Sequence, residues 1–353
     1  MESIEKTIGK IRAIDETIIK RTQERLDNLT KPLGSLGRLE ELAKQICGIT
    51  GKENPSLRNK VIFTLASDHG VTDEGVSAYP KEVTAQMVYN FLAGGAGINV
   101  LANHVGARVV VIDIGVCSDL RPDPKLMVKK INYGTKNMAK GPAMTKAEAI
   151  KAIRTGIELF EDEFRRGVDI AGTGEMGIGN TTASSAITAV FTKKPIADIT
   201  GRGAGLDDKG LERKIAVIEK SLSVNKPDPS DAIDVLSKVG GFEIAGLSGI
   251  ILAAAAKRIP VIIDGFISGA AALVAFHLEP KVKEYMIAAH CSVESGHKVI
   301  LEHIGLKPIL DLNLRLGEGT GAALGMSIAE AGIKILTEMA TFRSASVSER
   351  TDT

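Results

Sequence analysis

The chain has 353 residues, and its 44 lysines and arginines against 43 aspartates and glutamates leave a formal net charge of +1. This balance gives no reason to expect nucleic acid or an anionic membrane as a partner, and the absence of tryptophan argues against a surface that stacks on single-stranded bases. The length allows one large domain and a smaller one, and the 37 glycines with 25% charged residues are typical of a soluble α/β enzyme.

The first 55 residues are predicted to be helical and to contain no strand. A charged helical segment runs to about Asn28, and another helix follows a turn at 29–37. This second helix has one apolar stripe at helical spacing, formed by Leu39, Leu42, Ala43 and Ile46. We expect Glu40 and Lys44 to pair on its exposed side. Residues 1–55 are therefore predicted to form the helical part of a small domain, which packs on the main domain or on another subunit.

Residues 56–342 alternate between short apolar runs and helical patterns, which predicts an α/β catalytic domain. The apolar runs have the length of strands and lie at 61–66, 108–114, 168–171 and 260–264. One helix opens with the capping box Thr145–Glu148 and runs to about Arg166, and the last helix runs to about Phe342 and is expected to pack with the small domain. The alternation indicates a doubly wound, Rossmann-like parallel sheet with helices on both faces. Residues 343–353 are predicted to be a frayed polar tail.

The stretch A-G-T-G-E-M-G-I-G-N-T-T at 171–182 is predicted to be a glycine loop between a strand and the helix at 183–191. Its glycines permit a tight turn and a close approach to a ligand. The Thr181 and Thr182 hydroxyls lie at the helix start, beside free N–H groups, and this arrangement suits a phosphate. An ordinary strand-to-helix turn is the alternative. A second glycine-rich loop, at 199–208, leads into a helix that contains Lys214.

Other polar residues follow the predicted strands, where open α/β sheets bind ligands. Asp68 and His69 could be catalytic, metal-binding or structural. Glu318 lies between two glycines at the start of the last helix, where it could favour the helix dipole or act as a general base. Asp113 and Asp264 each stand alone after a strand. The pair of adjacent acids that holds the ribose hydroxyls and magnesium in most enzymes that use a pyrophosphate-activated ribose is therefore not expected.

Histidines, cysteines and the N-terminus carry little signal. The six histidines show no spacing typical of metal ligands, and His290 and His297 are interpreted as structural. The three cysteines form no C-x-x-C motif, which fits a reducing cytoplasm, and the first residues do not resemble a signal peptide. The apolar run at 244–256 is too short to cross a bilayer and is predicted to be a buried helix.

Motifs along nearly the whole chain resemble the nicotinate-nucleotide–dimethylbenzimidazole phosphoribosyltransferases, which make α-ribazole phosphate for the lower ligand of cobalamin. In order, they are K-P-L-G-S-L-G at 31–37, D-H-G-V at 68–71, E-G-V-S-A-Y-P at 74–80, V-T-A-Q-M-V at 83–88, G-E-M-G-I-G-N-T-T at 174–182, G-R-G-A-G-L at 201–206 and R-L-G-E-G-T-G-A-A at 315–323. The resemblance implies a doubly wound parallel sheet with a small helical domain, and a homodimer. It also implies transfer of the 5-phosphoribosyl group from nicotinate mononucleotide to 5,6-dimethylbenzimidazole, without a metal or another cofactor.

The resemblance also assigns the site residues. It places the catalytic base at Glu318. It places the nucleotide and phosphate site at Glu175, Gly177, Gly179, Asn180, Thr181, Gly203, Lys214 and Ser292, with Lys214 as the positive charge beside the phosphate. The benzimidazole pocket falls on Ser77, Tyr79, Gln86, Met176 and Leu316, and whether Ser77 or Tyr79 makes the polar contact stays open. Two alternatives remain: an enzyme of this fold that uses adenine or a phenol as acceptor, and a non-catalytic nucleotide-binding subunit, against which Glu318 argues.

Overall fold

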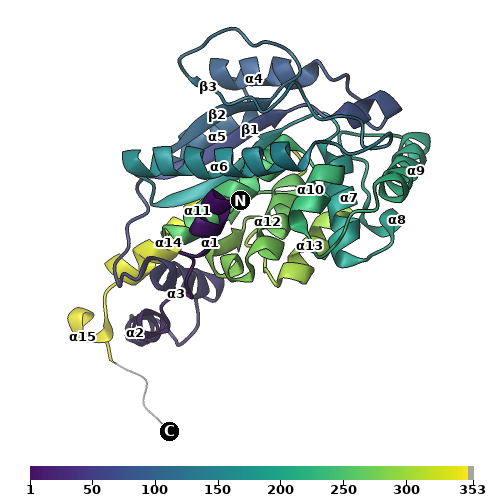
Figure 1. Cartoon of the computed structure of the whole chain (residues 1–353). Helices are drawn as coiled ribbons and strands as arrows, with labels where there is room; N and C mark the ends of the chain where they lie inside the picture. Colours follow the sequence, from purple (N-terminus) through teal and green to yellow (C-terminus); the bar gives the residue numbers. More distant parts are fainter. Residues whose placement is uncertain (349–353) are drawn as a thin grey trace.

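The computed structural model describes residues 1–348 and is built around one sheet of six parallel strands (Figure 1). The strands are β1 (Lys60–Ser67), β2 (Ala107–Gly115), β3 (Leu126–Val128), β4 (Ile170–Met176), β5 (Val261–Ile263) and β6 (Met286–Ala288). Their order in the sheet is β3-β2-β1-β4-β5-β6, so the direction of winding reverses between β1 and β4. The predicted doubly wound parallel sheet is confirmed.

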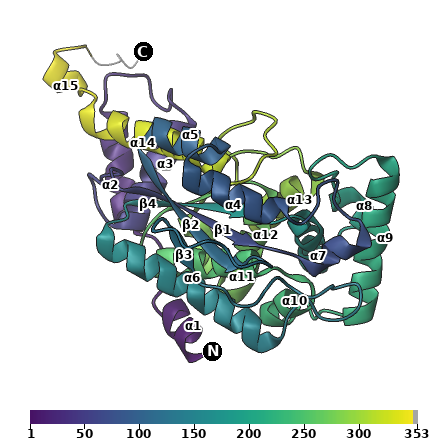
Figure 2. The ribbon, with the colours of Figure 1, turned by 90° about the horizontal axis from the view of Figure 1, so that it is seen from above.

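Helices cover both faces of this sheet, as predicted (Figure 2). One layer contains α1 (Glu2–Ile8), α6 (Lys146–Arg166), α7 (Asn180–Thr192), α10 (Ala232–Val239), α11 (Phe242–Ala256), α12 (Phe266–Leu278) and α13 (Ser295–Ile304). The other contains α2 (Glu16–Asp27), α3 (Arg38–Thr50), α4 (Val83–Ala93), α5 (Gly97–Val105) and α14 (Thr320–Glu338). Side chains of β1 alternate between the layers, with Phe63 and Leu65 in one core and Ile62 and Ala66 in the other.

Four short helices complete the described chain: η1 (Gly70–Glu74), α8 (Ile196–Ile199), η2 (Pro280–Tyr285) and α15 (Phe342–Ala345). The longer α9 (Asp208–Asn225) packs against α7 and α10. The N-terminal α1 packs on α6 and α11, whereas α2 and α3 pack with α14. Arg25 Nε donates a hydrogen bond to the Leu336 carbonyl at 2.7 Å, which ties α2 to the end of α14. The division into a small and a large domain stays a prediction.

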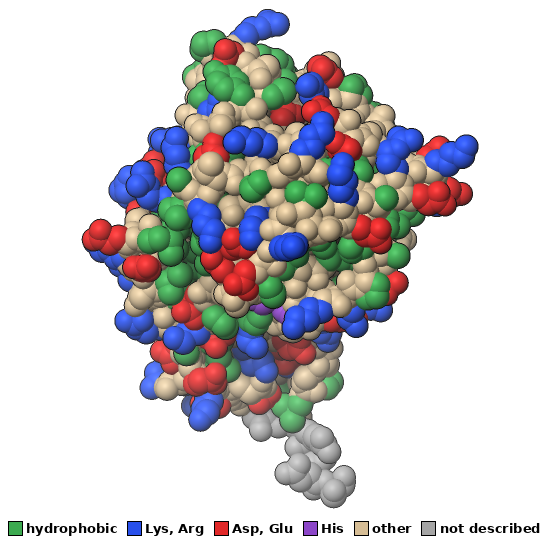
Figure 3. All heavy atoms as spheres, turned by 45° about the vertical axis from the view of Figure 1, so that its right-hand side comes forward, with side chains coloured by type: hydrophobic (Ala, Val, Ile, Leu, Met, Phe, Trp, Pro, Cys, Tyr) green, Lys and Arg blue, Asp and Glu red, His purple; other side chains and the backbone are tan. Residues whose placement is uncertain are grey.

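The charges on the surface are mixed. Figure 3 shows lysines and arginines interspersed with aspartates and glutamates over one face of the molecule. No helix within residues 1–348 has both the length and the apolar character needed to span a membrane.

The expected pair between Glu40 and Lys44 on the surface of α3 is wrong. Glu40 is buried, and its carboxylate pairs with Lys31 at 2.9 Å and accepts the Leu36 N–H at 3.0 Å. Lys44 instead donates to Gln23 Oε1 at 2.6 Å. The loop at 31–37 folds back over the first turn of α3 and encloses Glu40, which helical spacing within α3 alone does not reveal.

The predicted loop at 171–182 is wrong for its first half, because β4 continues to Met176. Gly172 and Gly174 lie within this strand, where α14 approaches so closely that side chains do not fit. A Cβ on Gly174 would lie 2.3 Å from the Glu318 carbonyl oxygen, and one on Gly172 would lie 2.9 Å from Met326 Cε. These two glycines therefore allow β4 to pack closely against α14 and the turn before it. Only the turn at 177–179 separates β4 from α7.

Several element ends also differ from the predictions. The strands β3 and β6 have three residues each and were not predicted, because such short runs show no periodicity. The equally short β5 was predicted from its β-branched run V-I-I. The helix α14 ends at Glu338 rather than near Phe342. Phe342–Ala345 forms α15 within the segment expected to be frayed, and the rest of that tail from 349 lies outside the described residues.

The α6 and α11 helices cross at unusually short range, and glycines make this possible. A Cβ on Gly156 would lie 1.9 Å from the Gly246 carbonyl oxygen, and one on Gly249 would lie 2.0 Å from the Ile153 carbonyl oxygen. Both contacts involve backbone atoms, which cannot rotate away as a side chain can. The crossing therefore depends on the missing methyl groups.

We predict that Gly156→Ala destabilises the protein. Alanine favours the helical state by about 1 kcal/mol, but overpacking at a rigid contact typically costs about 1–3 kcal/mol or more, and we expect the second effect to win. Urea unfolding followed by circular dichroism measures the difference. Gly141→Ala is the control, since a Cβ there meets no atom within 4 Å. A Gly156→Ala protein more stable than the parent would show that the helices separate freely.

Candidate active site

The carboxyl ends of β4, β5 and β6 open into a cleft of about 620 Å³. Its walls include Glu175 and Met176 at the end of β4, Gly265 after β5, His290 after β6 and the segment 313–318 that leads into α14. The loop that follows β1 closes it from the other side through Val76, Ser77 and Tyr79. This is the position, beside the reversal of strand order, where doubly wound sheets bind ligands.

Glu318 is held in an unusual backbone conformation at one end of the cleft. Its φ is +63°, between Gly317 at +82° and Gly319 at +100°, and its side chain is buried. The left-handed conformation costs a non-glycine residue roughly 1–3 kcal/mol, so the surroundings must enforce it. Oε2 of Glu318 accepts the Ile98 N–H at the start of α5, at 3.0 Å. The carboxylate thus contacts the N-terminus of α5, while the residue itself precedes α14.

Burial raises the pKa of the Glu318 carboxyl above its ordinary value. The Ile98 N–H opposes this shift, and the nearby charge of Asp264 adds to it. A carboxyl group with a raised pKa is a stronger base when it is ionised. The geometry therefore suits a general base that faces a ligand in the cleft.

Glu175 lies beneath the same turn. It belongs to the end of β4, is buried, and accepts a hydrogen bond from Asn180 Nδ2. A Cβ on Gly317 would lie 2.4 Å from Glu175 Oε1, which explains why glycine precedes Glu318. Burial, followed by the charges of Asp264 and Glu243, raises the pKa of Glu175 to about 8. Glu175, Asp264 and Glu318 thus form a cluster of buried acids at this end of the cleft.

Lys214 lies at the opposite end but behind the cleft wall. The side chain is fully buried, and its Nζ donates to Thr181 Oγ1 at 2.8 Å and to the Gly201 carbonyl at 3.1 Å. Burial lowers its pKa to about 8, and the charge of Glu294 opposes the shift. Thr181 and Gly203 line the cleft in front of it. The structure therefore places Lys214 one layer behind the expected phosphate.

The backbone of Gly203, expected to bind phosphate, already has partners on both sides. Its N–H donates to Glu294 Oε1 at 2.9 Å, and its carbonyl accepts from Arg315 Nη1 at 3.3 Å. Glu294 is buried and, together with Ser292, Arg202 and Arg315, lines this end of the cleft. The sequence pattern missed Glu294 and Arg315. Their signals were weak: Glu294 follows the unpredicted strand β6, and Arg315 lies in the R-L-G-E motif beside Glu318.

The expected base pocket is largely brought together. Ser77, Tyr79, Met176 and Leu316 all line the cleft near Glu318, and Ser77 Oγ accepts the Tyr79 N–H at 3.2 Å. Gln86 is exposed on α4 and is not among the lining residues. The helix α4 presents Val83 and Met87, which are four residues apart and share a helical face, to the cleft instead.

The remaining candidates lie around the glycine turn and the cleft floor. Gly177, Gly179 and Asn180 line the cleft, as expected of a ligand loop. His69 is buried below this turn and pairs with Glu243 at 2.7 Å, which supports the structural interpretation. His297 accepts the Ser292 N–H at 3.0 Å, while His290 lines the cleft. Among residues 1–348 no group of three or more histidines, cysteines or acids is arranged to hold a metal ion.

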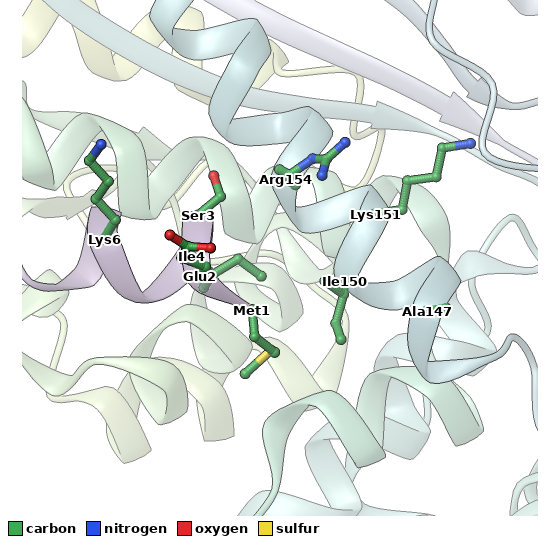
Figure 4. Close-up of a pocket in the computed structure, with 9 residues that line it drawn as sticks. All are labelled: Met1, Glu2, Ser3, Ile4, Lys6, Ala147, Ile150, Lys151 and Arg154. Atoms are coloured by element: carbon green, nitrogen blue, oxygen red, sulfur yellow. The ribbon is translucent and has the colours of Figure 1, made fainter.

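A separate hollow lies between α1 and the first turns of α6 (Figure 4). Its polar side chains include Lys6, Lys151 and Arg154, which are exposed and extend from the surface. Exposed cations of this kind are strongly hydrated and do not by themselves make a binding site. The cleft at the sheet edge is therefore the candidate active site.

Known proteins share both the sequence and the fold. A family model described as phosphoribosyltransferase matches residues 11–347. The chain is 59% identical over 352 residues to the nicotinate-nucleotide–dimethylbenzimidazole phosphoribosyltransferase of Geobacter metallireducens, covering 100% of both chains. It is 58% identical to the protein of that name from Desulforudis audaxviator, covering 99% of each. The crystal structure of CobT from Thermus thermophilus is 42% identical, with a TM-score of 0.91 over 95% of this chain and 100% of that one.

We predict that Glu175→Gln changes the dependence of stability on pH. With a pKa of about 8 when folded and an ordinary value of 4.5, Glu175 keeps its proton in the folded state where the unfolded chain has lost it. The free energy of unfolding of the parent therefore falls as pH rises through this window, by up to about 1.4 kcal/mol per pH unit.

Glutamine does not titrate, so the variant should become more stable relative to the parent as pH rises from about 5 to about 8. Urea unfolding of both proteins across this range measures the difference, in which the contributions of groups that do not interact with Glu175 cancel. A difference that stays constant with pH would show that Glu175 is already ionised in the folded protein.

Proposed function

The chain belongs to the nicotinate-nucleotide–dimethylbenzimidazole phosphoribosyltransferases, and we propose that its cleft carries out their reaction with Glu318 as the base. The enzyme transfers the 5-phosphoribosyl group of nicotinate mononucleotide to 5,6-dimethylbenzimidazole. The products are nicotinate and α-ribazole 5′-phosphate, which supplies the lower ligand of cobalamin. The observation that carries the assignment of the base is the buried Glu318 carboxyl, held in a left-handed turn at one end of the cleft.

The chemistry explains why one carboxylate is enough. Nicotinate is bound to C1′ as a pyridinium and leaves with the bonding electron pair as a neutral ring, so the leaving group needs no proton. The incoming benzimidazole attacks C1′ through one ring nitrogen and becomes cationic. Glu318 then takes the proton from the other ring nitrogen and stabilises the developing positive charge. Attack on the face opposite the leaving group inverts C1′ and gives the α-riboside, and no step requires a metal ion.

The phosphate is proposed to bind at the start of α7. Thr181 Oγ1 accepts from Lys214, so its own proton is free to point into the cleft and donate to a phosphate oxygen. The N–H groups and dipole at the start of α7 favour the same anion. Arg202, Arg315 and Ser292 line this end and can add donors. Lys214 then acts on the phosphate through Thr181 and through its charge, with Gly177, Gly179, Asn180 and Gly203 forming the surrounding loops.

The base is proposed to lie between Met176, Leu316 and Met87, with one nitrogen toward Glu318. Ser77 Oγ accepts the Tyr79 N–H, which leaves the serine proton free for a polar contact with the ring. Glu175 lies below the Glu318 turn and is proposed to face the ribose. Gln86 would need a change in α4 to reach the base.

We also propose that the enzyme is a cytoplasmic homodimer, as the family resemblance implies. Leu33 and Leu312 are more than half exposed, at 66% and 52%, and such apolar surface is available to a partner subunit. Light scattering on the purified protein measures the mass of the assembly and tests this directly.

We predict that Glu318→Gln lowers the turnover of nicotinate mononucleotide and dimethylbenzimidazole by about 10²–10⁴-fold. Glutamine keeps the shape of the side chain but cannot take the proton. The affinity for the nucleotide should change little, because the phosphate loops are untouched. Product formation by chromatography and nucleotide affinity by calorimetry separate the two effects. Glu302→Gln, an exposed carboxylate on α13, is the control. Near-normal turnover in a folded Glu318→Gln enzyme would reject Glu318 as the base, and Glu175 would be tested next.

We predict that Lys214→Met weakens nucleotide binding. Methionine fills the space of the lysine stem but removes its charge and its hydrogen bond to Thr181, and a charge-assisted hydrogen bond contributes roughly 1.5–3 kcal/mol, or about 10- to 100-fold in Kd. Calorimetry with nicotinate mononucleotide measures the change. Lys220→Met, an exposed lysine on the same helix, should leave Kd unchanged. An unaltered Kd in Lys214→Met would remove this residue from the phosphate site.

A further inference from the structure

We propose that Asp264, together with Thr64, positions Glu318 for catalysis by holding the turn on which Glu318 lies. This inference rests on the proposed role of Glu318 as the base. Asp264 follows β5 and Thr64 belongs to β1, so both are far from Glu318 in the sequence. Neither has to touch the substrate for this role. Both act through the backbone of the turn.

Asp264 binds the backbone on the C-terminal side of Glu318. Its side chain is 1% exposed. Oδ2 accepts the Gly319 N–H at 3.2 Å, and Oδ1 accepts the Ala322 N–H at 3.0 Å. These N–H groups lie at the start of α14, where no carbonyl of the helix itself is available to them. A carboxylate is also favoured there by the helix dipole. Asp264 therefore caps α14 from the edge of the sheet.

Two other strands hold the same turn. Thr64 Oγ1 on β1 donates to the Glu318 carbonyl at 3.1 Å. On β4, Gly174 lies so close to that carbonyl that a Cβ would be 2.3 Å from it. Since Glu318 has a positive φ, the turn is strained and would relax if these contacts were lost. Relaxation would move the carboxylate away from the Ile98 N–H and from the benzimidazole nitrogen.

Asp264 also shares the electrostatic environment of Glu318. The charged and titratable groups around this pair are Glu175 at the end of β4 and His290 after β6, whose Nε2 lies 3.9 Å from Asp264 Oδ1. Glu243 on α11 acts on Glu175 in turn. Burial is the main cause that raises the pKa of Glu318, the Ile98 N–H on α5 opposes it, and the charge of Asp264 raises the pKa further. Neutralising Asp264 should therefore lower the pKa of Glu318 and move the acid limb of activity to lower pH.

A purely structural helix cap predicts a different result. Loss of such a cap would reduce the free energy of unfolding but would leave the properties of the base unchanged. A positioning residue instead changes kcat while KM stays nearly constant, and its effect disappears once the base itself is removed. The decisive readouts are therefore the split between kcat and KM, the pH profile and a double-mutant cycle.

The experiment compares Asp264→Asn, Glu318→Gln and the double variant in steady-state assays with nicotinate mononucleotide and dimethylbenzimidazole. We expect Asp264→Asn to lower kcat by about 10- to 100-fold, since small misplacements of a reacting group have effects of this size. We expect KM to be nearly unchanged, the acid limb of kcat to move to lower pH, and no further loss in the Glu318→Gln background. Asp113→Asn is the matched control, because Asp113 is another buried acid at a strand end that accepts a backbone N–H, from Val116 at 2.9 Å.

Equal losses from Asp264→Asn with and without Glu318 would overturn the inference, as would an unchanged kcat and acid limb. Near-normal turnover in Glu318→Gln alone would instead reject the proposed base, so the two failures are distinguishable. If Asp264→Asn does not fold, the Thr64→Val variant tests the inference instead. Valine keeps the shape and removes the hydroxyl, and a lost hydrogen bond should lower kcat roughly fivefold, again only when Glu318 is present. An unchanged kcat in Thr64→Val would then overturn the inference.

Discussion

The active site depends on the close approach of α14 to β4. Gly172 and Gly174 remove the side chains that would separate β4 from the helix. On the helix, Gly325 allows a similar approach to the neighbouring strand β5, where a Cβ would lie 2.9 Å from Ile262 Cγ2. The carboxylate of Glu318 enters the cleft because α14 begins directly against the sheet. If α14 were displaced from the sheet by the width of a methyl group, the Glu318 carboxylate would move out of the cleft. The packing of the fold and the placement of the base are therefore one and the same constraint.

Charge is separated along the cleft. Glu175, Asp264 and Glu318 lie at the base end, where burial raises the pKa of each, whereas Lys214 and Arg315 lie at the other end together with Glu294. Backbone N–H groups such as that of Ile98 partly compensate the buried acids. This polarity matches nicotinate mononucleotide, whose phosphate is anionic and whose pyridinium is cationic. It also matches the benzimidazolium that forms as the new bond is made.

The sequence predicted the sheet, the second glycine-rich loop and the position of Glu318 ahead of the last helix, because these depend on local patterns and on motifs in a fixed order. The role of Glu318 as the base stays a prediction. The predictions from the sequence were wrong where the contact that decides a residue's position comes from a distant part of the chain. Gly172 and Gly174 were predicted to be loop residues, since a glycine signals either a turn or a close approach, and only α14, far along the chain, decides between them. The partner of Glu40 and the depth of Lys214 depend on loops that fold over them. Three-residue strands such as β6 carry no periodic signal, which hid Glu294 and its place in the site.

The charge of Glu294 partly compensates the buried Lys214 before a ligand binds. In the structure its carboxylate takes the Gly203 N–H and attracts Lys214, so an anion already occupies the end of the cleft that is proposed to hold the phosphate. A phosphate that binds there is a second anion near Lys214, in addition to Glu294. The loop does not have to expose an uncompensated lysine before the nucleotide binds, which would cost far more in a buried site. The Gly203 loop is held from both sides, by Glu294 and by Arg315, before the nucleotide binds.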